Sequence, residues 1–254
     1  KQVRDNVLNM GEVSFASTEI PAVDIKKSYS DFLFSKFKIP RKLKIVLDCG
    51  NGATCLSAPE VFKRFGHEVI EMFCNPDSSF PNRPSEPSPE NISALRKKVL
   101  EAGAELGIGF DGDADRIGVI DDKGNLLYGD DLMIIFFREI LKKYPGSPGI
   151  VEVKCSRRLY DEILKLGGKP VFYKSGHSLI KAKMRELRAR FTGEMAGHMF
   201  FADEYFGYDD AIYSGLRLLR ILSNSSAKLS EMLSDVPKYY STPEIRIDCA
   251  DEDK

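Results

Sequence analysis

Two short apolar runs, at residues 105–110 and 117–121, stand on either side of the hexapeptide Asp-Gly-Asp-Ala-Asp-Arg at residues 111–116. Runs of this length and composition are typical of buried β-strands, so the hexapeptide is expected to form a tight loop between two neighbouring strands. A loop at strand ends brings its side chains toward one point. This feature therefore constrains both the local fold and the chemistry that the fold presents.

The loop carries three carboxylates at alternate positions, Asp111, Asp113 and Asp115, followed directly by Arg116. Carboxylates this close repel one another unless a cation neutralises them, and hard oxygen ligands favour Mg²⁺ or Ca²⁺. Alternate residues of an extended loop point to the same side, so we expect the three side chains to converge around one cation. An EF-hand is excluded because its loop requires glycine where Arg116 stands, and a helix on each side. A solvated acidic turn is the alternative interpretation.

The rest of the chain alternates short strand patterns with amphipathic stretches of helical period, which predicts an α/β fold. A length of 254 residues favours two consecutive domains of ordinary size. Helices are expected at residues 24–37, 53–65, 90–102, 130–143, 156–166, 177–190 and 210–223. Strands are expected at residues 43–48, 68–73, 105–110, 117–121, 149–153, 169–173, 191–194 and 199–201, and a strand-like run at 244–248 follows a linker at 237–243.

Charge and cysteine content exclude several classes of protein. Lys and Arg number 37 against 38 Asp and Glu, so no basic surface is expected for nucleic acid, and a small-molecule role is favoured. The five cysteines are odd in number and never spaced C-x-x-C, which argues against a disulfide framework or a zinc site and favours a reducing compartment. No run approaches the roughly 20 apolar residues of a membrane span, so a cytoplasmic protein without membrane contact is predicted.

Two of the three histidines lie in glycine-framed turns, His177 in Gly-His-Ser and His198 at the end of Gly-Glu-Met-Ala-Gly-His. The second turn places Glu194 and an imidazole on one short loop, which suits binding of sugar hydroxyls beside a proton-transfer group. Lys154 follows the apolar strand pattern 150–153, at a strand end where functional residues of α/β sheets gather. An ordinary polar loop and a solvent-facing lysine are the alternatives. The turn Asn51-Gly52-Ala53 lacks any complete phosphate-loop motif and is interpreted as structural.

Taken together, G-F-D-G-D-A-D-R, G-H-S and G-E-M-x-G-H, in this order and at these distances, closely resemble the motifs of the α-D-phosphohexomutases. The resemblance is to the phosphomannomutase/phosphoglucomutase group, and it covers essentially the whole chain. It implies the second and third of the family's four domains, each a mixed sheet flanked by helices. The expected boundaries are 1–124 for the second domain, 125–237 for the third, and 238–254 for a linker and the start of the fourth.

The resemblance also implies roles for the acidic loop. Asp111, Asp113 and Asp115 would bind Mg²⁺, and Arg116 would contact the phosphoryl group in transfer. The implied reaction interconverts hexose 1-phosphate and hexose 6-phosphate through a bisphosphorylated sugar, and such phosphoryl transfer is catalysed mainly by positioning and charge stabilisation.

For the remaining motifs, the resemblance implies that Glu194 holds sugar hydroxyls and that His198 is a general acid or base. Lys154 and His177 would contact the substrate as it binds and reorients, and Lys154 is also counted with the catalytic residues. All of these side chains, with Arg116, are expected to line one cleft between the domains. Ala196 departs from the group, which commonly has serine there, so one hydrogen bond to the sugar is in doubt.

The family's phosphorylated serine lies in its first domain and its phosphate clamp in its fourth. Neither motif occurs in this sequence, so both ends are expected to be cut from a longer chain and the isolated chain is expected to be inactive. A phosphohexosamine mutase is the nearest alternative, although Met195 disfavours it. A non-catalytic module that binds a sugar phosphate or a metal is the alternative from another class.

Overall fold

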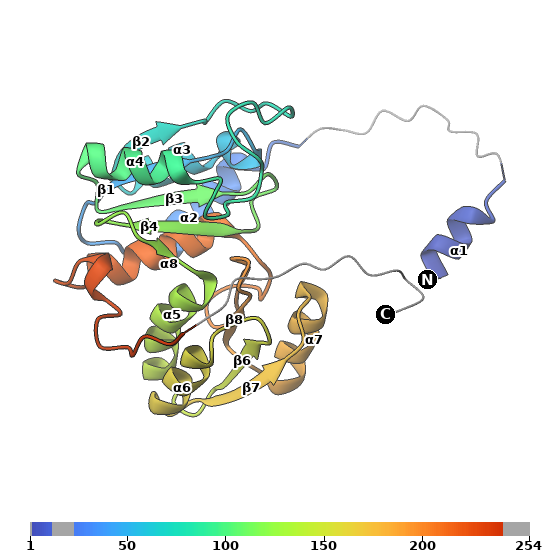
Figure 1. Ribbon diagram of the computed structural model, residues 1–254. Helices are drawn as coiled ribbons and strands as arrows, with labels where there is room; N and C mark the ends of the chain where they lie inside the picture. Colours follow the sequence, from blue (N-terminus) through green and yellow to red (C-terminus); the bar gives the residue numbers. More distant parts are fainter. Residues whose placement is uncertain (1, 12–22, 241–254) are drawn as a thin grey trace.

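The computed structural model describes residues 2–11 and 23–240, and its centre is formed by two β-sheets with helices on both faces of each (Figure 1). The first sheet contains β1 (Lys44–Asp48), β2 (Glu68–Met72), β3 (Leu106–Phe110), β4 (Ile117–Asp121) and β5 (Leu126–Leu127), in the order β2-β1-β3-β4-β5. The second contains β6 (Pro148–Glu152), β7 (Lys169–Tyr173), β8 (Phe191–Gly193) and β9 (Met199–Phe201), in the order β7-β6-β8-β9. The predicted α/β class is confirmed.

The helices lie close to the ranges that the sequence predicts. They are α1 (Gln2–Leu8), α2 (Lys26–Lys36), α3 (Ala58–Arg64), α4 (Ser93–Ala102), α5 (Gly129–Lys143), α6 (Arg157–Lys165), α7 (His177–Leu187) and α8 (Ala211–Ser223), with short 3₁₀ turns η1 (Ala53–Leu56) and η2 (Leu229–Glu231). Helix α1 was not predicted, and none of its residues is buried. None of the helices within residues 2–11 and 23–240 is long and apolar enough to span a membrane.

Three details differ from the predictions. The helix expected over 53–65 is divided at Ser57, because Pro59 has no backbone N–H and starts a new helix, α3. The helix expected over residues 24–37 begins later, at Lys26, and Ile25 precedes it and is exposed. The strand-like run at 244–248 and most of the predicted segment 238–254 lie outside the described residues.

The first four strands of the first sheet have the same topology as the four strands of the second. In each, one central strand, β1 or β6, pairs in parallel with both of its neighbours. The third strand along the chain then turns back into an antiparallel partner, so that β3 pairs with β4 and β8 with β9. The acidic loop connects β3 to β4, and the loop with Glu194 and His198 connects β8 to β9. The two predicted functional loops therefore occupy equivalent places in two similar units.

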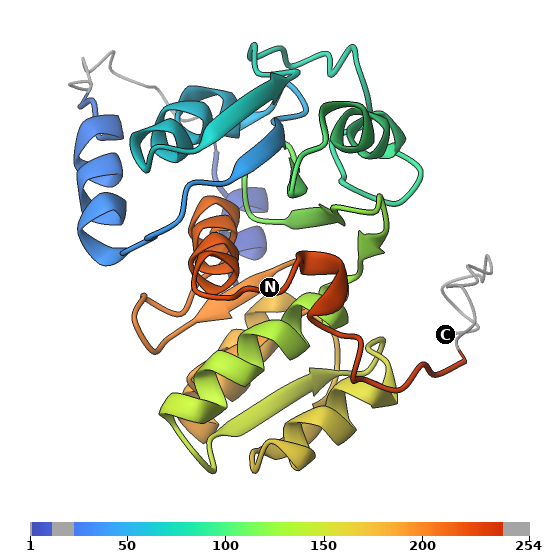
Figure 2. The ribbon, with the colours of Figure 1, turned by 90° about the vertical axis from the view of Figure 1, so that its left-hand side faces the viewer.

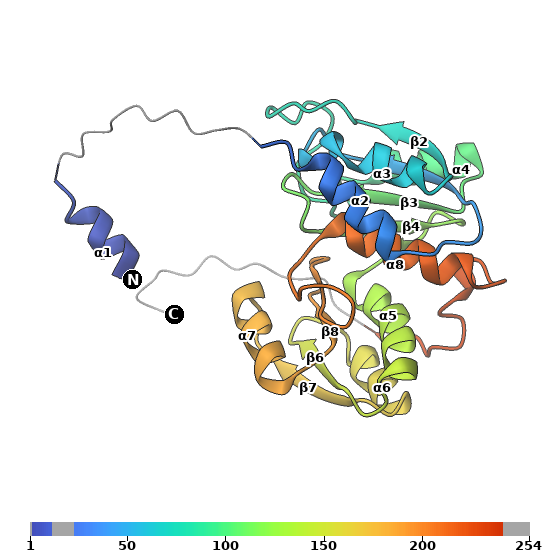
Figure 3. The same ribbon diagram turned by 180° about the vertical axis from the view of Figure 1, so that it is seen from behind.

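Alternation along the strands divides the apolar side chains between two faces of each sheet. In β1, Val46 packs with α4, whereas Ile45 and Leu47 face a larger core together with α2, α3 and α8. In the second sheet, Ile150 packs with α7, whereas Val151 faces α5 and α6. The inner faces of both sheets thus share one continuous core, in which α8 lies between the first sheet and α5 (Figures 2 and 3).

The shared core bears on the predicted boundary at residues 124 and 125. Strand β5 extends the first sheet beyond that point, and α8 packs on the first sheet although it follows the second sheet in the chain. Gly215 of α8 lies where a Cβ would be 2.9 Å from the ring of Phe62 in α3. The boundary stays a prediction, since the two units are packed together along α8.

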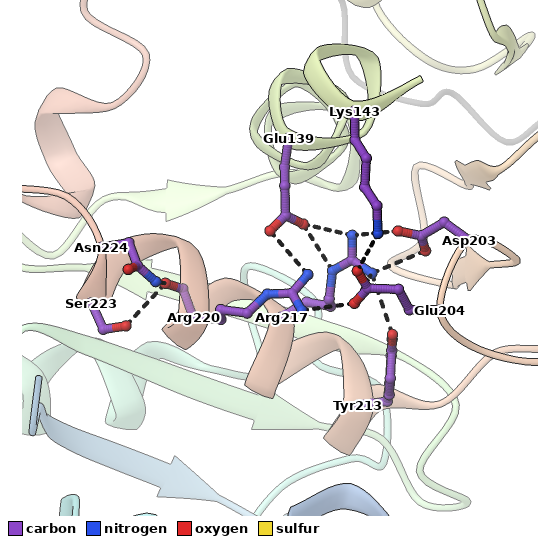
Figure 4. Close-up of polar contacts among 9 residues, drawn as sticks. All are labelled: Glu139, Lys143, Asp203, Glu204, Tyr213, Arg217, Arg220, Ser223 and Asn224. Carbon is purple, nitrogen blue, oxygen red and sulfur yellow. Dashed lines mark hydrogen bonds and ion pairs between the residues drawn. The ribbon is translucent and has the colours of Figure 1, made fainter. Parts of the chain in front are cut away.

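Arg217 joins α8 to the second unit through the polar contacts drawn in Figure 4. Its side chain is only 1% exposed. Its two terminal nitrogens each donate to one oxygen of Asp203 at 3.0 Å, and Nε donates to Glu139 of α5 at 2.9 Å. Tyr213 accepts a further bond at 3.3 Å. A planar guanidinium held by two carboxylates in this way fixes direction as well as charge.

We predict that Arg217→Met lowers the free energy of unfolding by about 3–5 kcal/mol, because it leaves the buried Asp203 carboxylate without a cation. Urea unfolding followed by circular dichroism measures the change. Lys27→Met, which removes an ion pair with Asp31 on the surface of α2, is the control and should change stability by less than about 1 kcal/mol. Equal effects of the two substitutions would contradict the role given to Arg217.

His67 is a structural histidine. It is buried beside β1, and its Nδ1 accepts the backbone N–H of Leu43 at 3.1 Å. Burial lowers the pKa of His67 to about 4, so the folded protein holds the ring neutral.

The stability that His67 contributes is therefore complete above its unfolded pKa of about 6.5 and is lost as the pH falls toward 4. We predict that between pH 6.5 and pH 5 the free energy of unfolding falls by about 1 kcal/mol less in the His67→Asn protein than in the unmodified chain. The asparagine keeps a hydrogen-bond acceptor near Leu43. Urea unfolding at both pH values tests this. The other histidines are present in both proteins, so an unchanged pH slope would contradict the prediction.

Candidate active site

The acidic loop brings its three carboxylates together. One oxygen from each of Asp111, Asp113 and Asp115 lies within 4.8 Å of the others. The loop is not extended, however, because Ala114 has a φ of 73°, in the left-handed region, and turns the backbone. The expected convergence is present, but it results from this turn and not from simple alternation of side chains.

Asp111 organises the loop from within. One of its oxygens accepts the backbone N–H groups of Asp115 and Arg116, each at 3.0 Å, and the other accepts Arg116 Nε at 2.7 Å. Burial alone would raise the pKa of Asp111, but the bonds from Asp115 and Arg116 outweigh it and lower the pKa. The guanidinium also donates to the exposed Glu86 at 2.6 Å. An exposed pair of this kind is weak, so an anionic ligand can replace Glu86 at Arg116.

Behind the loop, Arg83 and the turn after β1 hold its backbone in place. Arg83 is almost fully buried, and it donates to Asp48 at 2.8 Å and to the carbonyl of Phe110 at 2.7 Å. Gly52 lies so close to the loop that a Cβ would be 2.7 Å from the carbonyl oxygen of Gly112. The turn at residues 51–53 was interpreted as structural, and this contact shows that its function in the fold is to support the acidic loop.

The loop between β8 and β9 binds the turn that precedes α7. Glu194 is buried, and one of its oxygens accepts the backbone N–H of Gly176 at 2.9 Å. This bond places His177, the next residue, beside His198, with ring centroids 5.6 Å apart and nearly parallel. Glu194 and the two histidines therefore belong to one site.

The two hairpin loops meet directly. Arg116 and His198 form an antiparallel bridge, and the N–H of Ile117 donates to the carbonyl of Gly197 at 3.2 Å. Gly197 has a φ of 101°, and a Cβ there would be 2.6 Å from the carbonyl oxygen of Ile117. A side chain at Gly197 would push the loops apart, so this position requires glycine.

His198 lies between two carboxylates. Its Nδ1 is 3.0 Å from Asp209 and 3.6 Å from Asp115, and Asp209 is also 3.6 Å from Nδ1 of His177 and 3.0 Å from Lys181. These contacts of His198 are close ion-pair contacts and not well-aligned hydrogen bonds. The facing atoms of His198, Asp115 and Asp209 have no well-oriented hydrogen-bond partner within the described residues.

These contacts set the charges of the site. Burial would lower the pKa of His198, but contact with Asp209 and the charges of Asp115, Asp209 and Glu194 raise it instead. Burial would raise the pKa of Asp209, yet His198 and Lys181 hold it well below the usual range. For Asp115, burial and the adjacent Asp111 raise the pKa to about 7. The opposite shifts of His198 and Asp209 therefore favour an ion pair between the imidazolium and this carboxylate.

Four of the five side chains expected in one cleft are brought together, namely Arg116, His177, Glu194 and His198. Lys154 lies in the exposed turn after β6, and its place beside these four side chains stays a prediction. Ala196 is exposed in the loop between β8 and β9.

Two further residues of the site were not predicted from the sequence. Glu152 is buried at the end of β6, where it accepts the hydroxyl of Ser175 and the N–H of Met195, the latter at 2.8 Å. A lone carboxylate within an apolar strand was the available signal. The other is Asp209, which precedes the N-cap residue of α8, Asp210, and carried no distinguishing pattern.

The acidic cluster fits a hard divalent cation. Three carboxylates supply oxygen donors at suitable spacing, and one buried oxygen of Asp115 has no hydrogen-bond partner within the described residues. Asp115, His198 and Asp209 also lie within 4.8 Å of one another through their donor atoms, so Asp115 belongs to both groups.

Two similar α/β units thus bring an acidic cluster and an arginine against a glutamate and two imidazoles, which are the residues of the motifs that resemble those of the phosphohexomutases. Two family models match the chain, phosphoglucomutase/phosphomannomutase α/β/α domain II over residues 27–124 and domain III over residues 128–240. The chain belongs to the phosphoglucomutase/phosphomannomutase family.

Individual relatives agree with the family models. The chain is 42% identical over 248 residues to the phosphomannomutase/phosphoglucomutase of Pseudomonas putida, covering 97% of this chain and 54% of that protein. It is 45% identical over 236 residues to the corresponding Pseudomonas syringae protein, covering 92% and 51%. A crystal structure of a family protein from Burkholderia thailandensis superposes with a TM-score of 0.83 at 41% identity, covering 87% of this chain and 48% of that one. The chain thus spans about half the length of the relatives it matches.

We predict that Gly52→Ala weakens divalent-cation binding to the chain at least tenfold, because the new Cβ displaces the backbone at Gly112. Binding of Mn²⁺, followed by electron paramagnetic resonance with Mg²⁺ as competitor, measures the affinity. Gly11→Ala is the control, since nothing lies within 4 Å of a Cβ there. Cation affinity of the Gly52→Ala protein within twofold of the control would show that the turn does not support the site.

Proposed function

We propose that this chain is the central part of a phosphomannomutase/phosphoglucomutase, corresponding to the second and third of four domains. The enzyme interconverts hexose 1-phosphate and hexose 6-phosphate through a bisphosphorylated sugar. The observation that carries the proposal is the direct contact of the acidic hairpin loop with the loop of Glu194 and His198, in a chain that matches the family's domains II and III.

In this proposal, Asp111, Asp113 and Asp115 hold Mg²⁺, which supplies positive charge beside the phosphoryl oxygens when bound. Arg116 binds the phosphoryl group in transfer, exchanging its exposed contact with Glu86 for the more highly charged ligand. The bond from Asp111 to Arg116 Nε keeps the guanidinium oriented during that exchange. Phosphoryl transfer needs mainly such positioning and charge stabilisation.

Glu194 binds sugar hydroxyls with the oxygen that does not accept from Gly176. Lys154 and His177 contact the sugar phosphate in its alternative orientations. At residue 196 the methyl group of Ala196 cannot hydrogen-bond, so the sugar has one partner fewer than in relatives with serine there. Since hexose specificity depends on such hydroxyl contacts, this loop is where substrate preference would be set.

His198 acts as general acid or base. Asp209 and Asp115 face its Nδ1, so they favour the protonated ring and leave Nε2 for exchange with a sugar hydroxyl. Contact with Asp209 and the charge of Asp115 raise the pKa of His198, which favours the protonated ring and so suits a group that donates a proton to a sugar oxygen.

We expect the chain to bind glucose 1-phosphate weakly and more tightly when Mg²⁺ is present, as measured by ³¹P NMR titration. Glu194→Gln should weaken the binding of the sugar phosphate at least tenfold without changing its dependence on Mg²⁺. Glu186→Gln, on the exposed face of α7, is the matched control. Absence of any Mg²⁺-dependent binding in the unmodified chain would contradict the proposal.

We also expect no turnover when the chain is given glucose 1-phosphate, glucose 1,6-bisphosphate and Mg²⁺ in a coupled assay. The phosphorylated serine and the phosphate clamp of the family lie in its first and fourth domains, and without the covalent intermediate the route itself is missing. A four-domain relative such as that of Pseudomonas putida is the positive control. Isomerisation at a few per cent of its rate would mean that another residue accepts the phosphoryl group, and Ser175 and Ser178 would be replaced first.

A phosphohexosamine mutase is the second candidate. The chain is 37% identical over 237 residues to a probable phosphoglucosamine mutase of Methanothermobacter thermautotrophicus, a lower value than for the phosphomannomutase/phosphoglucomutase relatives. Tighter binding of glucosamine 1-phosphate than of glucose 1-phosphate in the same titration would favour it.

A further inference from the structure

Two cysteines meet at the ends of neighbouring parallel strands. Cys49 follows β1 and Cys74 comes two residues after β2, and the paired strand ends Asp48 and Met72 hold them side by side. The N–H of Cys49 donates to the carbonyl of Met72 at 3.1 Å, and the two sulfur atoms lie 2.9 Å apart. A disulfide requires about 2.05 Å, so the sulfurs need to approach by only about 0.9 Å.

The two thiols differ in exposure and in acidity. Cys49 is fully buried, whereas Cys74 lines a surface hollow of about 690 Å³ together with Cys55 and Lys63. Contact with the Cys49 thiol lowers the pKa of Cys74, and the same contact, together with burial, raises that of Cys49. Cys74 is therefore the thiol that an oxidant can reach and the one that more readily becomes a thiolate.

We propose that Cys49 and Cys74 form an oxidative modification site that closes to a reversible disulfide when the protein meets a hydroperoxide. The Cys74 thiolate attacks one peroxide oxygen, the O–O bond breaks, and the departing oxygen takes a proton to leave water and a Cys74 sulfenic acid. The Cys49 sulfur then attacks the Cys74 sulfur, the S–O bond breaks, and the hydroxide takes the Cys49 proton as a second water. Two thiols are oxidised and one hydrogen peroxide is reduced to two waters.

The disulfide would join the ends of β1 and β2, next to the turn at residues 51–53 that supports the acidic loop. Between the two cysteines, the N–H of Asn51 already donates to the carbonyl of Phe73 at 2.8 Å, and Gly52 touches the acidic loop at Gly112. Closing this segment of 25 positions removes conformational freedom from the unfolded chain. The oxidised protein is therefore more stable, and its acidic loop stays in place. This inference does not rest on the proposed function.

The test treats the full chain, carrying Cys249→Ser so that no thiol outside the described residues contributes, with one equivalent of hydrogen peroxide. Free thiols are alkylated and peptides are analysed by mass spectrometry. We expect a Cys49–Cys74 link as the main product, with loss of two hydrogen atoms and full reversal by dithiothreitol. The oxidised chain should melt about 5 °C or more above the reduced chain.

Variants assign the roles of the thiols. Cys74→Ser, at the less buried position, should abolish both the link and the rise in Tm. Cys49→Ala should leave a Cys74 sulfenic acid that dimedone traps, and Cys155→Ser, in the second unit, should behave as the unmodified chain. A link between Cys55 and Cys74 in place of the expected one, retention of the Cys49 thiol, or an unchanged Tm on oxidation would overturn the proposal.

Discussion

The buried guanidinium of Arg217 is the interaction on which the relative position of the two α/β units depends. Helix α8 covers the inner face of the first sheet, yet its Arg217 is bonded to Asp203, which follows β9, and to Glu139 of α5. Apolar packing along the helix stabilises the contact between the units but hardly restricts their orientation, whereas a bidentate ion pair allows few geometries. Because α8 is anchored at one end by Asp210, the same helix fixes Asp209 beside His198.

With the units held in this way, the site follows from their shared topology. Each sheet turns back after its third strand, and the two resulting hairpin loops meet through the backbone of Arg116, Ile117, Gly197 and His198. One loop contributes carboxylates, and the other a glutamate and an imidazole. Neither unit alone contains the whole site. The binding of a ligand that contacts both loops therefore also depends on the contact between the two units. Buried polar contacts far from the site thus affect ligand binding.

Asp115 links the two halves of the site electrostatically. It is one of the three carboxylates of the acidic cluster, and it also faces His198 across the junction. A cation that occupies the cluster competes with the imidazolium for the same negative charge. Cation binding and the protonation of His198 are thus thermodynamically linked. The bound cation changes the proton affinity of His198 by the same factor by which the proton changes the affinity for the cation. In a phosphohexomutase this would couple the charge of the acid or base to the filling of the phosphoryl site.

The sequence by itself determined most of the strands and helices to within a few residues, although not α1 or the short β5, because the period of the apolar positions reports which face of each element is buried. It also determined the acidic loop and the motifs that place the chain in its family, since these are contiguous and chemically distinctive. Tertiary structure alone decided that α8 crosses to the first sheet, that Glu152 and Asp209 join the site, and that Cys49 lies against Cys74. Periodicity shows that a face is buried but not what it is buried against. Residues distant in the chain become neighbours only through the order of the strands and the packing of helices between the sheets.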